Sequence, residues 1–342
     1  ARRQRQMCIR DRDIHAGYIT ETVRQMVFDR YREAAYTRGL NVYTTVRARD
    51  QFAAWKAVQA GVLAYELRQP YRGPDAFVDL PGAVDAIPDA VEQACADRAP
   101  ADGMQCSVVL SATPTLVKVM TGAGQIVSVS GAGLRQVRAL ALGDKAQPNV
   151  KLRPGAVVWL ASEGKDDWVI TQLPQVQSAF VSMNPNNGAI VAMVGGMDFA
   201  RNKFNHATQA WRQPGSSFKP FIYSAALEKG ITPLTVVNDA PLFFSAAQTG
   251  GESWEPKNYD GKYDGPITLR RGLAQSKNMV AIRVLDFIGP KFAQTWSTRF
   301  GFDASRQPPY LTLALGAGTV TPLQMARAYS VFANGGYLLR PY

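Results

Sequence analysis

The sequence predicts an α+β protein in which a helical linker region and a small all-β module precede a mixed domain of helices and strands. Three observations support this prediction. Apolar residues recur at helical spacing before Pro70, and short apolar runs punctuated by Pro and Gly follow from Tyr71. After Gln177 a hairpin pattern leads into several helical patterns. The 342 residues leave room for two or three domains.

Composition limits the class of protein. The chain has 38 Lys and Arg against 27 Asp and Glu, a net charge of +11, and 46% of its residues are hydrophobic. This hydrophobic content is that of a folded protein. The positive balance favours a negatively charged polymer or a membrane surface as a neighbour. No block of Lys and Arg interleaves with aromatic residues, so we expect no nucleic acid as a partner. No apolar run reaches 18 residues, the length of a membrane span.

The first residues, "ARRQRQMCIRDRD", look like an in-frame translation of a sequencing adapter, and we expect residues 1–12 to be a non-native leader. Cys95 and Cys106 remain. They can form a disulfide in an oxidising compartment or stay free, and the sequence leaves both states open. The chain has no C-x-x-C and no Cys/His cluster, and its two histidines are His15 and His206. We therefore expect no zinc site.

Residues 13–70 form the linker region, or the start of the last domain, in this prediction. Helical spacing predicts a helix over residues 18–37 and a second one over 52–65, which ends before Pro70. Between them, "GLNVYTTVR" alternates apolar and polar residues and predicts a half-buried strand at residues 39–47.

Residues 71–175 form the predicted β module. Four runs are strand candidates: "CSVVLSATPTLVKVM", "GQIVSVSG", "AVVWLAS" and "DWVITQL". The turns "TGAG" and "SEGKDD" separate some of them, which is typical of a small sandwich or barrel. Barrels of the OB type often bind polymers. A structural spacer explains the same pattern equally well.

Residues 176–342 form the predicted α+β domain. "SAFVSMNPNNGAIVAMVGG" places two apolar runs around Asn-Gly, which predicts a β-hairpin. Helices are expected to start near Ser216, Met279, Lys291 and Thr321. The last of these opens with "TPLQ", a Thr N-cap followed by Pro, with Gln at the third helical position.

Ser216 and Lys219 carry the candidate chemistry of this domain. Ser216 follows a Pro-Gly break and opens a helix, and Lys219 lies three residues later, on the same face. A serine hydroxyl needs an adjacent base to act as a nucleophile. A lysine becomes that base when desolvation lowers its pKa, and the flanking Phe218 and Phe221 offer an apolar surround. The alternative is a helix-start serine beside a solvated lysine.

A single S-x-x-K pattern is weak, because the chain contains a second copy at Ser162 and Lys165, in a polar turn. A second element strengthens the first copy. Ser276 and Asn278 lie in a polar break before a helical pattern, about sixty residues beyond Ser216. The Ser276 hydroxyl can relay a proton, and the Asn278 amide can hold a peptide carbonyl or orient the lysine. Ser182-x-Asn184 repeats this spacing on the predicted hairpin and is a decoy.

S-x-x-K followed by S-x-N resembles the motif pair of penicillin-binding proteins and serine β-lactamases. Longer stretches resemble the class A, bifunctional penicillin-binding proteins of the 1A type over nearly the whole chain. These stretches are "GLNVYTTV", "YRGPDAF", "NPNNGAIVAMVGGMDF", "FNHATQAWRQPGSSFKPFIYSAALEKG", "LRRGLAQSKNMVAIRV" and "LALGAGTVTPLQMARAYSVFANGG". The resemblance implies a serine transpeptidase or β-lactamase-like fold after an OB-like insert.

The resemblance also implies roles. Ser216 would be the acyl-accepting nucleophile and Lys219 its general base, and Ser276 and Asn278 would form the second motif. The substrate would be the D-Ala-D-Ala end of a peptidoglycan stem peptide, which Ser216 attacks to form an acyl-enzyme. An amine of a neighbouring stem would resolve it into a cross-link. β-Lactam antibiotics would acylate Ser216, and the reaction would need no metal and no organic cofactor. The parent protein would lie on the periplasmic side of the bacterial inner membrane, and an outer-membrane regulator could contact the OB-like module.

The chain departs from the family pattern in three ways. The second motif reads Ser-Lys-Asn, no Lys-Thr-Gly occurs, and no glycosyltransferase domain or membrane anchor precedes the match. We expect truncation at both ends, before the Lys-Thr-Gly strand, and hence a fragment that does not complete transpeptidation. Alternatives are a serine β-lactamase, a D,D-carboxypeptidase, or a non-catalytic β-lactam-binding module.

Overall fold

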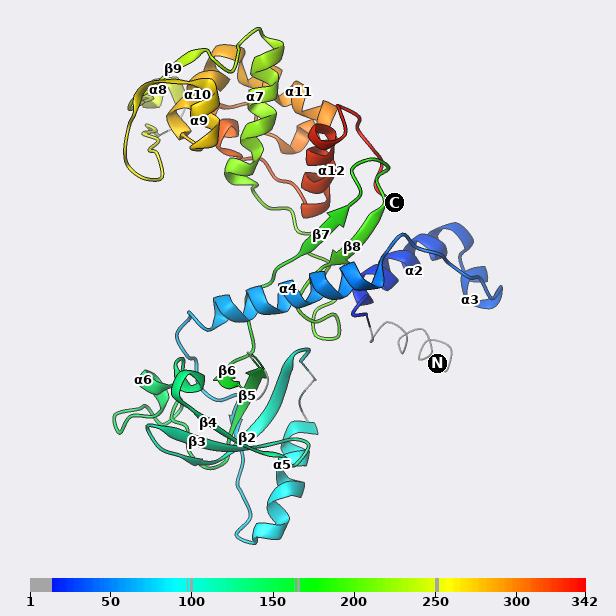
Figure 1. Ribbon diagram of the computed structural model, residues 1–342, viewed down its shortest axis with the longest axis vertical. Helices are drawn as coiled ribbons and strands as arrows, with labels where there is room; N and C mark the ends of the chain where they lie inside the picture. Colours follow the sequence, from blue (N-terminus) through cyan, green and yellow to red (C-terminus); the bar gives the residue numbers. More distant parts are fainter. Residues whose placement is uncertain (1–13, 97, 99–100, 163, 165–166, 250–251) are drawn as a thin grey trace. The chain divides into compact units, whose positions relative to one another are not determined.

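The structure is a computed structural model that describes residues 14–96, 98, 101–162, 164, 167–249 and 252–342 (Figure 1). The expected leader at residues 1–12 lies outside these described residues. The chain divides into two compact units: the first contains Ala1–Phe180 and Ala192–His206, and the second contains Val181–Val191 and Ala207–Tyr342. None of the helices formed by the described residues combines the length and apolar character that a membrane span requires.

The first unit begins with helices α2 (Gly17–Tyr31), α3 (Ala34–Thr37) and α4 (Ala48–Glu66). The predicted helix over residues 18–37 is therefore present but interrupted at Arg32, which adopts φ +51°. Helix α4 buries Ala54, Val58 and Val62, residues spaced four apart and so on one face. The fully buried Gln51 amide exchanges hydrogen bonds with the backbone N and O of Met193, at 2.9 and 3.1 Å.

The predicted strand at residues 39–47 is wrong. The segment is irregular, and its apolar side chains at Leu40, Val42 and Tyr43 are exposed. No strand in the described part of the chain pairs with it. Alternating apolar residues favour a strand only where a neighbouring strand satisfies the backbone and a core covers one face.

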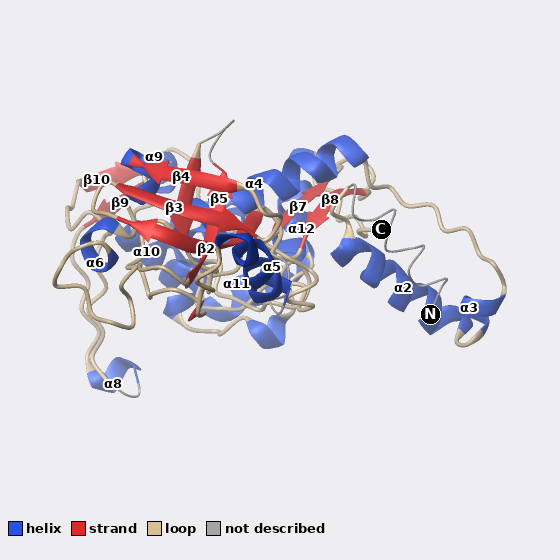
Figure 2. Ribbon diagram, turned by 90° about the horizontal axis from the view of Figure 1, so that it is seen from below, coloured by secondary structure: helices blue, strands red, loops and turns tan. Residues whose placement is uncertain are grey.

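The predicted β module forms one antiparallel sheet in the first unit, with strand order β1-β5-β2-β3-β4 and with β6 paired to β5. Its strands are drawn in red in Figure 2. They are β1 (Ala76–Phe77), β2 (Met104–Ala112), β3 (Leu116–Thr121), β4 (Ile126–Ser130), β5 (Ala156–Ser162) and β6 (Trp168–Thr171). Val117 and Val119 on β3 and Val127 and Val129 on β4 face one core, as period-two spacing requires. The four strand candidates are confirmed.

The module also contains helices, so its description as all-β was incomplete. The helical segments are η1 (Val84–Ala86), α5 (Ile87–Ala96), η2 (Gly131–Leu134) and α6 (Arg138–Ala141). Helix α5 packs Val91 and Ala94 against Val108 of β2 and Met120 of β3. The sequence pattern missed α5 because it is only ten residues long and has Pro88 in its first turn.

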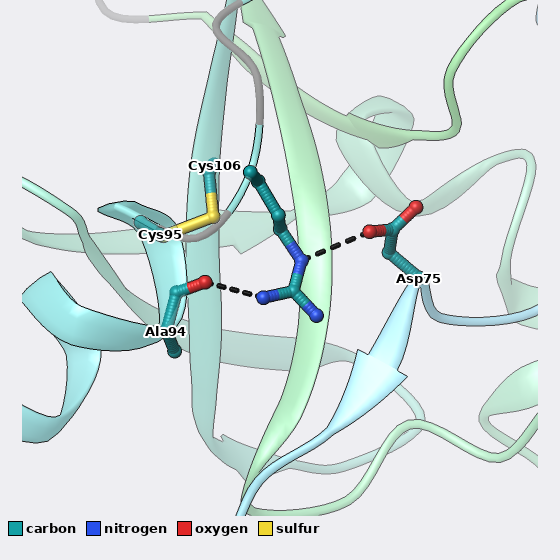
Figure 3. The surroundings of a disulfide bond; sticks show 5 residues. Asp75, Ala94, Cys95 and Cys106 are labelled. Atoms are coloured by element: carbon teal, nitrogen blue, oxygen red, sulfur yellow. Dashed lines mark hydrogen bonds and ion pairs between the residues drawn. A yellow bond between two sulfur atoms is a disulfide. The ribbon is translucent and has the colours of Figure 1, made fainter.

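A disulfide joins Cys95 at the end of α5 to Cys106 on β2, with a Cα–Cα distance of 5.6 Å (Figure 3). This decides the question that the sequence left open. Arg98 donates hydrogen bonds to the carbonyl of Ala94, the residue before Cys95, and, at 2.9 Å, to the Asp75 carboxylate. The disulfide and Arg98 therefore both tie the end of α5 to the sheet.

The predicted hairpin is formed by β7 (Phe180–Met183) and β8 (Ile190–Val194). Gly188, in the turn, has φ +84° and donates its backbone N–H to the Asn184 carbonyl at 2.9 Å. Asn-Gly suits this turn because glycine adopts positive φ without steric cost.

The remainder of the second unit is mainly helical. Its elements are η3 (Gly215–Phe218), α7 (Lys219–Glu228), β9 (Val236–Asp239), α8 (Ala246–Thr249), β10 (Gly265–Thr268), α9 (Leu269–Ala274), α10 (Asn278–Ile288), α11 (Pro290–Ser297), η4 (Thr298–Phe300), η5 (Ala304–Arg306), η6 (Leu311–Leu315) and α12 (Pro322–Ala333). The predicted helix starts are confirmed, and Thr321 and Gln324 form the expected capping box. Helix α7 packs against α10 and α11. Strands β9 and β10 pair antiparallel.

Replacing both Cys95 and Cys106 by Ser should lower the free energy of unfolding of the β module by about 2–3 kcal/mol. The bridge closes a loop with a sequence separation of 11 residues, and its removal restores entropy to the unfolded chain. Urea unfolding followed by tryptophan fluorescence measures the change, because the module contains Trp159 and Trp168 among the six tryptophans of the chain.

The wild-type protein in reducing buffer is the matched control, and its unfolding midpoint should fall to that of the double variant. A midpoint that is equal for the oxidised, reduced and Ser/Ser proteins would show that the bridge does not stabilise the module.

Candidate active site

Ser216 lies in the short helix η3, and its side chain is exposed. The preceding Gly215 has φ +58°, and the backbone of Gly316 approaches it closely. A Cβ atom on Gly316 would lie 2.1 Å from the Gly215 carbonyl oxygen, so only glycine fits there. The Tyr329 hydroxyl donates to the Ser217 carbonyl at 2.8 Å. Contacts from distant residues thus fix the backbone on either side of Ser216.

Lys219 is the first residue of α7, and its side chain is only 1% exposed. Its Nζ donates to the Ser276 carbonyl at 2.7 Å, to Ser276 Oγ at 3.1 Å and to Asn278 Oδ1 at 2.8 Å. Burial lowers the pKa of Lys219 to about 8. Three acceptors therefore orient the Lys219 side chain. With a pKa of about 8, roughly a tenth of the Lys219 side chains are neutral at pH 7.

Ser276 and Asn278 lie at the junction of α9 and α10. Ser276 adopts φ +55°, an uncommon conformation for a residue with a side chain. The Asn278 side chain donates through Nδ2 to the Lys257 carbonyl at 2.8 Å, which turns its Oδ1 toward Lys219. Of the two roles that the sequence suggested for this amide, the structure shows the contact that orients the lysine.

The structure brings together Lys219, Ser276 and Asn278 but does not join Ser216 to them directly. Within the described residues, no hydrogen bond links Ser216 Oγ to Lys219 Nζ, although the sequence predicted their approach. Catalytic hydrogen bonds are often long without substrate and tighten when it binds. Phe218 and Phe221, which flank the lysine in the chain, are both buried in the apolar core.

The two decoy patterns do not form comparable sites. The Ser162 hydroxyl donates to the nearby Gly164 carbonyl at the end of β5. Its partner Lys165 lies outside the described residues. Ser182 is part of strand β7, and Asn184 caps the hairpin turn by accepting from the backbone N–H of Asn186.

Asn258 and Lys277 are part of the site but had no predicted role. Asn258 is buried, and its Oδ1 accepts from the backbone N–H groups of Asn278 and Met279, at 2.8 and 3.3 Å. It therefore caps helix α10 from twenty residues upstream. No local pattern around Asn258 predicts this contact, whereas Lys277 lay inside a motif that was already identified.

A buried amine of lowered pKa beside a second serine and an amide can accept and return a proton. An exposed serine at the start of a helix can attack an acyl carbon, and helix N–H groups favour the resulting oxyanion. The described residues contain no group of three or more His, Cys, Asp or Glu placed to hold a metal ion. The geometry suits acyl transfer through a serine ester.

Two family models match the chain. Residues 71–176 match the penicillin-binding protein OB-like domain, and residues 178–342 match the penicillin-binding protein transpeptidase domain. Penicillin-binding protein 1A of Neisseria lactamica is 44% identical over 336 residues, which cover 96% of this chain and 41% of that protein. Penicillin-binding protein 1A of Escherichia coli K12 is 40% identical over 332 residues, covering 96% of this chain and 39% of that protein.

The fold leads to the same family. The crystal structure of penicillin-binding protein 1A from Haemophilus influenzae matches with a TM-score of 0.85 and 38% identity, covering 95% of this chain and 47% of that one. The chain spans about two fifths of the length of the curated relatives it matches. With an OB-like domain followed by a transpeptidase domain, the chain belongs to the penicillin-binding proteins of the 1A type.

Proposed function

We propose that this chain carries the acylating site of a peptidoglycan D,D-transpeptidase, within a bifunctional glycosyltransferase and transpeptidase of cell-wall synthesis. Ser216 is the nucleophile, Lys219 its general base, Ser276 the proton relay and Asn278 the residue that orients the lysine. The observation that carries the proposal is the buried Lys219, whose amine is shared by Ser276 and Asn278.

The reaction follows from these positions. Neutral Lys219 accepts the Ser216 hydroxyl proton as Oγ bonds to the carbonyl carbon of the penultimate D-Ala. The C–N bond to the terminal D-Ala then breaks, and the proton passes from Lys219 through the Ser276 hydroxyl to the leaving amine. The amine of a second stem peptide then attacks the Ser216 ester and forms the cross-link, while a proton of that amine passes through Lys219 to Ser216 Oγ, which leaves as the free hydroxyl. A β-lactam enters by the same first step, and its opened ring stays on Ser216.

The wider assignments belong to the same proposal. Domain limits of 71–175 for the OB-like module and 176–342 for the transpeptidase domain are supported by the ranges of the two family models. A place on the periplasmic side of the inner membrane, with an anchor outside this segment, fits the named relatives and the disulfide. An outer-membrane regulator remains a candidate partner of the OB-like module.

Replacing Ser216 by Ala should abolish covalent labelling by a fluorescent penicillin, because the ester cannot form without the Oγ atom. The experiment uses the complete reading frame from the source genome, and mass spectrometry identifies the labelled peptide. Ser217→Ala is the matched control, since Ser217 is also exposed and adjacent, and labelling of that variant should persist.

Four other outcomes separate the alternatives. A label that maps away from the Ser216 peptide contradicts the catalytic assignment. Rapid loss of the label to water favours a serine β-lactamase, and release of D-Ala without amine transfer favours a D,D-carboxypeptidase. Transfer onto a stem-peptide amine supports the transpeptidase.

The acylation rate should rise with pH below about 8 and level off above it. Only neutral Lys219 can accept the Ser216 proton, and with a pKa of about 8 roughly a tenth of it is neutral at pH 7. Lowering the pH from 7 to 6 should therefore slow labelling about tenfold. Initial labelling rates between pH 6 and 9.5 measure this dependence.

The Lys219→Arg variant is the control, because a guanidinium stays protonated over this range. It should label far more slowly than the wild type at every pH. A wild-type profile that is flat between pH 6 and 9 would show that Lys219 is not the base.

A further inference from the structure

Lys277 lies between the two residues that bind Lys219, and its own side chain is buried, with 5% exposed. Its Nζ lies 3.4 Å from Asp239 Oδ2, 3.3 Å from Asp260 Oδ2 and 3.6 Å from Asp264 Oδ1. A buried ammonium needs such partners, because an unpaired charge in the interior is strongly unfavourable. The acylation mechanism above uses none of these four groups.

Asp239 is the centre of this cluster. It is fully buried at the end of β9, opposite Gly265 of β10. Its Oδ1 accepts from Asn258 Nδ2 at 2.8 Å, and its Oδ2 accepts from the Asp264 backbone N–H at 3.0 Å. The carboxylate that binds Lys277 is therefore fixed by its own strand pair and by a buried amide.

Asn258 extends the network to the start of α10. The same amide that donates to Asp239 accepts, through Oδ1, from the backbone N–H groups of Asn278 and Met279. The turn before α10 is thus tied to Asp239 twice, once through the Lys277 side chain and once through Asn258. Lys277 is adjacent to Ser276 and Asn278, and Asn258 binds the backbone of Asn278 itself. Both connections therefore reach the residues that bind Lys219.

We propose that Lys277 is a positioning residue of the active site: its ammonium, held on Asp239, fixes the turn so that Ser276 and Asn278 converge on Lys219. Ser276 has φ +55°, a conformation that persists only where the surroundings enforce it. Lys277 is the next residue, and its anchored side chain supplies that constraint. The proposal rests on the proposed function only for its effect on acylation.

The Lys277 side chain is positively charged at neutral pH. Burial alone would lower the pKa of Lys277, but the hydrogen bond to Asp260 and the charges of Asp239, Asp260 and Asp264 outweigh burial and raise it. A methionine of similar length fills the same space without binding carboxylates. The substitution Lys277→Met therefore removes the anchor and leaves Asp239 without its ammonium.

Two variants test the role of Lys277. Lys277→Met removes the anchor alone. Lys277→Met combined with Asp239→Asn also removes the carboxylate charge, so no buried anion is left without a cation. Arg271→Met is the matched control, because Arg271 binds the same cluster at Asp264, at 3.1 Å, but is 55% exposed. Lys277→Arg keeps the charge and tests for rescue.

The main readout is NMR titration of lysine labelled with ¹³C at Cε, in which the Lys219 resonance is identified by its loss in Lys219→Arg. Loss of the anchor should shift the Lys219 pKa by about half a unit or more and slow fluorescent-penicillin labelling about tenfold. Arg271→Met should leave both unchanged, and Lys277→Arg should restore part of the loss. Circular dichroism melting reports folding separately.

A wild-type Lys219 titration and labelling rate in the folded double variant would overturn the proposal. Failure of both Lys277 variants to fold would also overturn it, because the cluster would then support the whole domain rather than the turn. If the wild type is not labelled at all, the proposed function fails, and the NMR titration still decides whether Lys277 positions Lys219.

Discussion

The candidate site depends on one buried amine. Lys219 Nζ donates to three acceptors from a turn 57 to 59 positions further along the chain, and these bonds join the start of α7 to the start of α10. Hydrogen bonds to charged groups contribute about 1.5–3 kcal/mol each. They offset the cost of burying the amine but do not remove it, and the remaining cost lowers the pKa of Lys219 to about 8. Burial of Lys219 therefore costs stability, and it also lowers the pKa enough for some of the amine to be neutral near pH 7.

The rest of the second unit can be understood as support for this contact. Phe218 and Phe221, on either side of Lys219 in the sequence, are buried in the apolar core of the unit and so anchor the start of α7. The close approach of Gly316 to Gly215 fixes the backbone before Ser216. Protein interiors are close-packed and do not deform continuously, so a side chain held on several sides keeps its geometry without a ligand.

The first unit is stabilised differently. Its sheet contributes residues to three apolar clusters, and a disulfide lies beside the cluster that α5 covers. None of the described residues of the β module is a buried Lys or Arg, whereas the second unit buries both Lys219 and Lys277.

The sequence by itself predicted the order of the domains, most strands and helices, and the four candidate site residues Ser216, Lys219, Ser276 and Asn278, because periodicity, capping and motif spacing can be read from the sequence. The sequence prediction was wrong for residues 39–47, where the strand pattern has no partner strand in the described part of the chain. It also missed α5, which is only ten residues long. Only the tertiary structure decided that Cys95 bonds Cys106 and that Asn258 and Asp239 hold the turn beside Lys219. Those contacts join segments that are distant in sequence. A sequence pattern does not show which partners a buried polar group will bind, because tertiary packing decides which groups lie next to it.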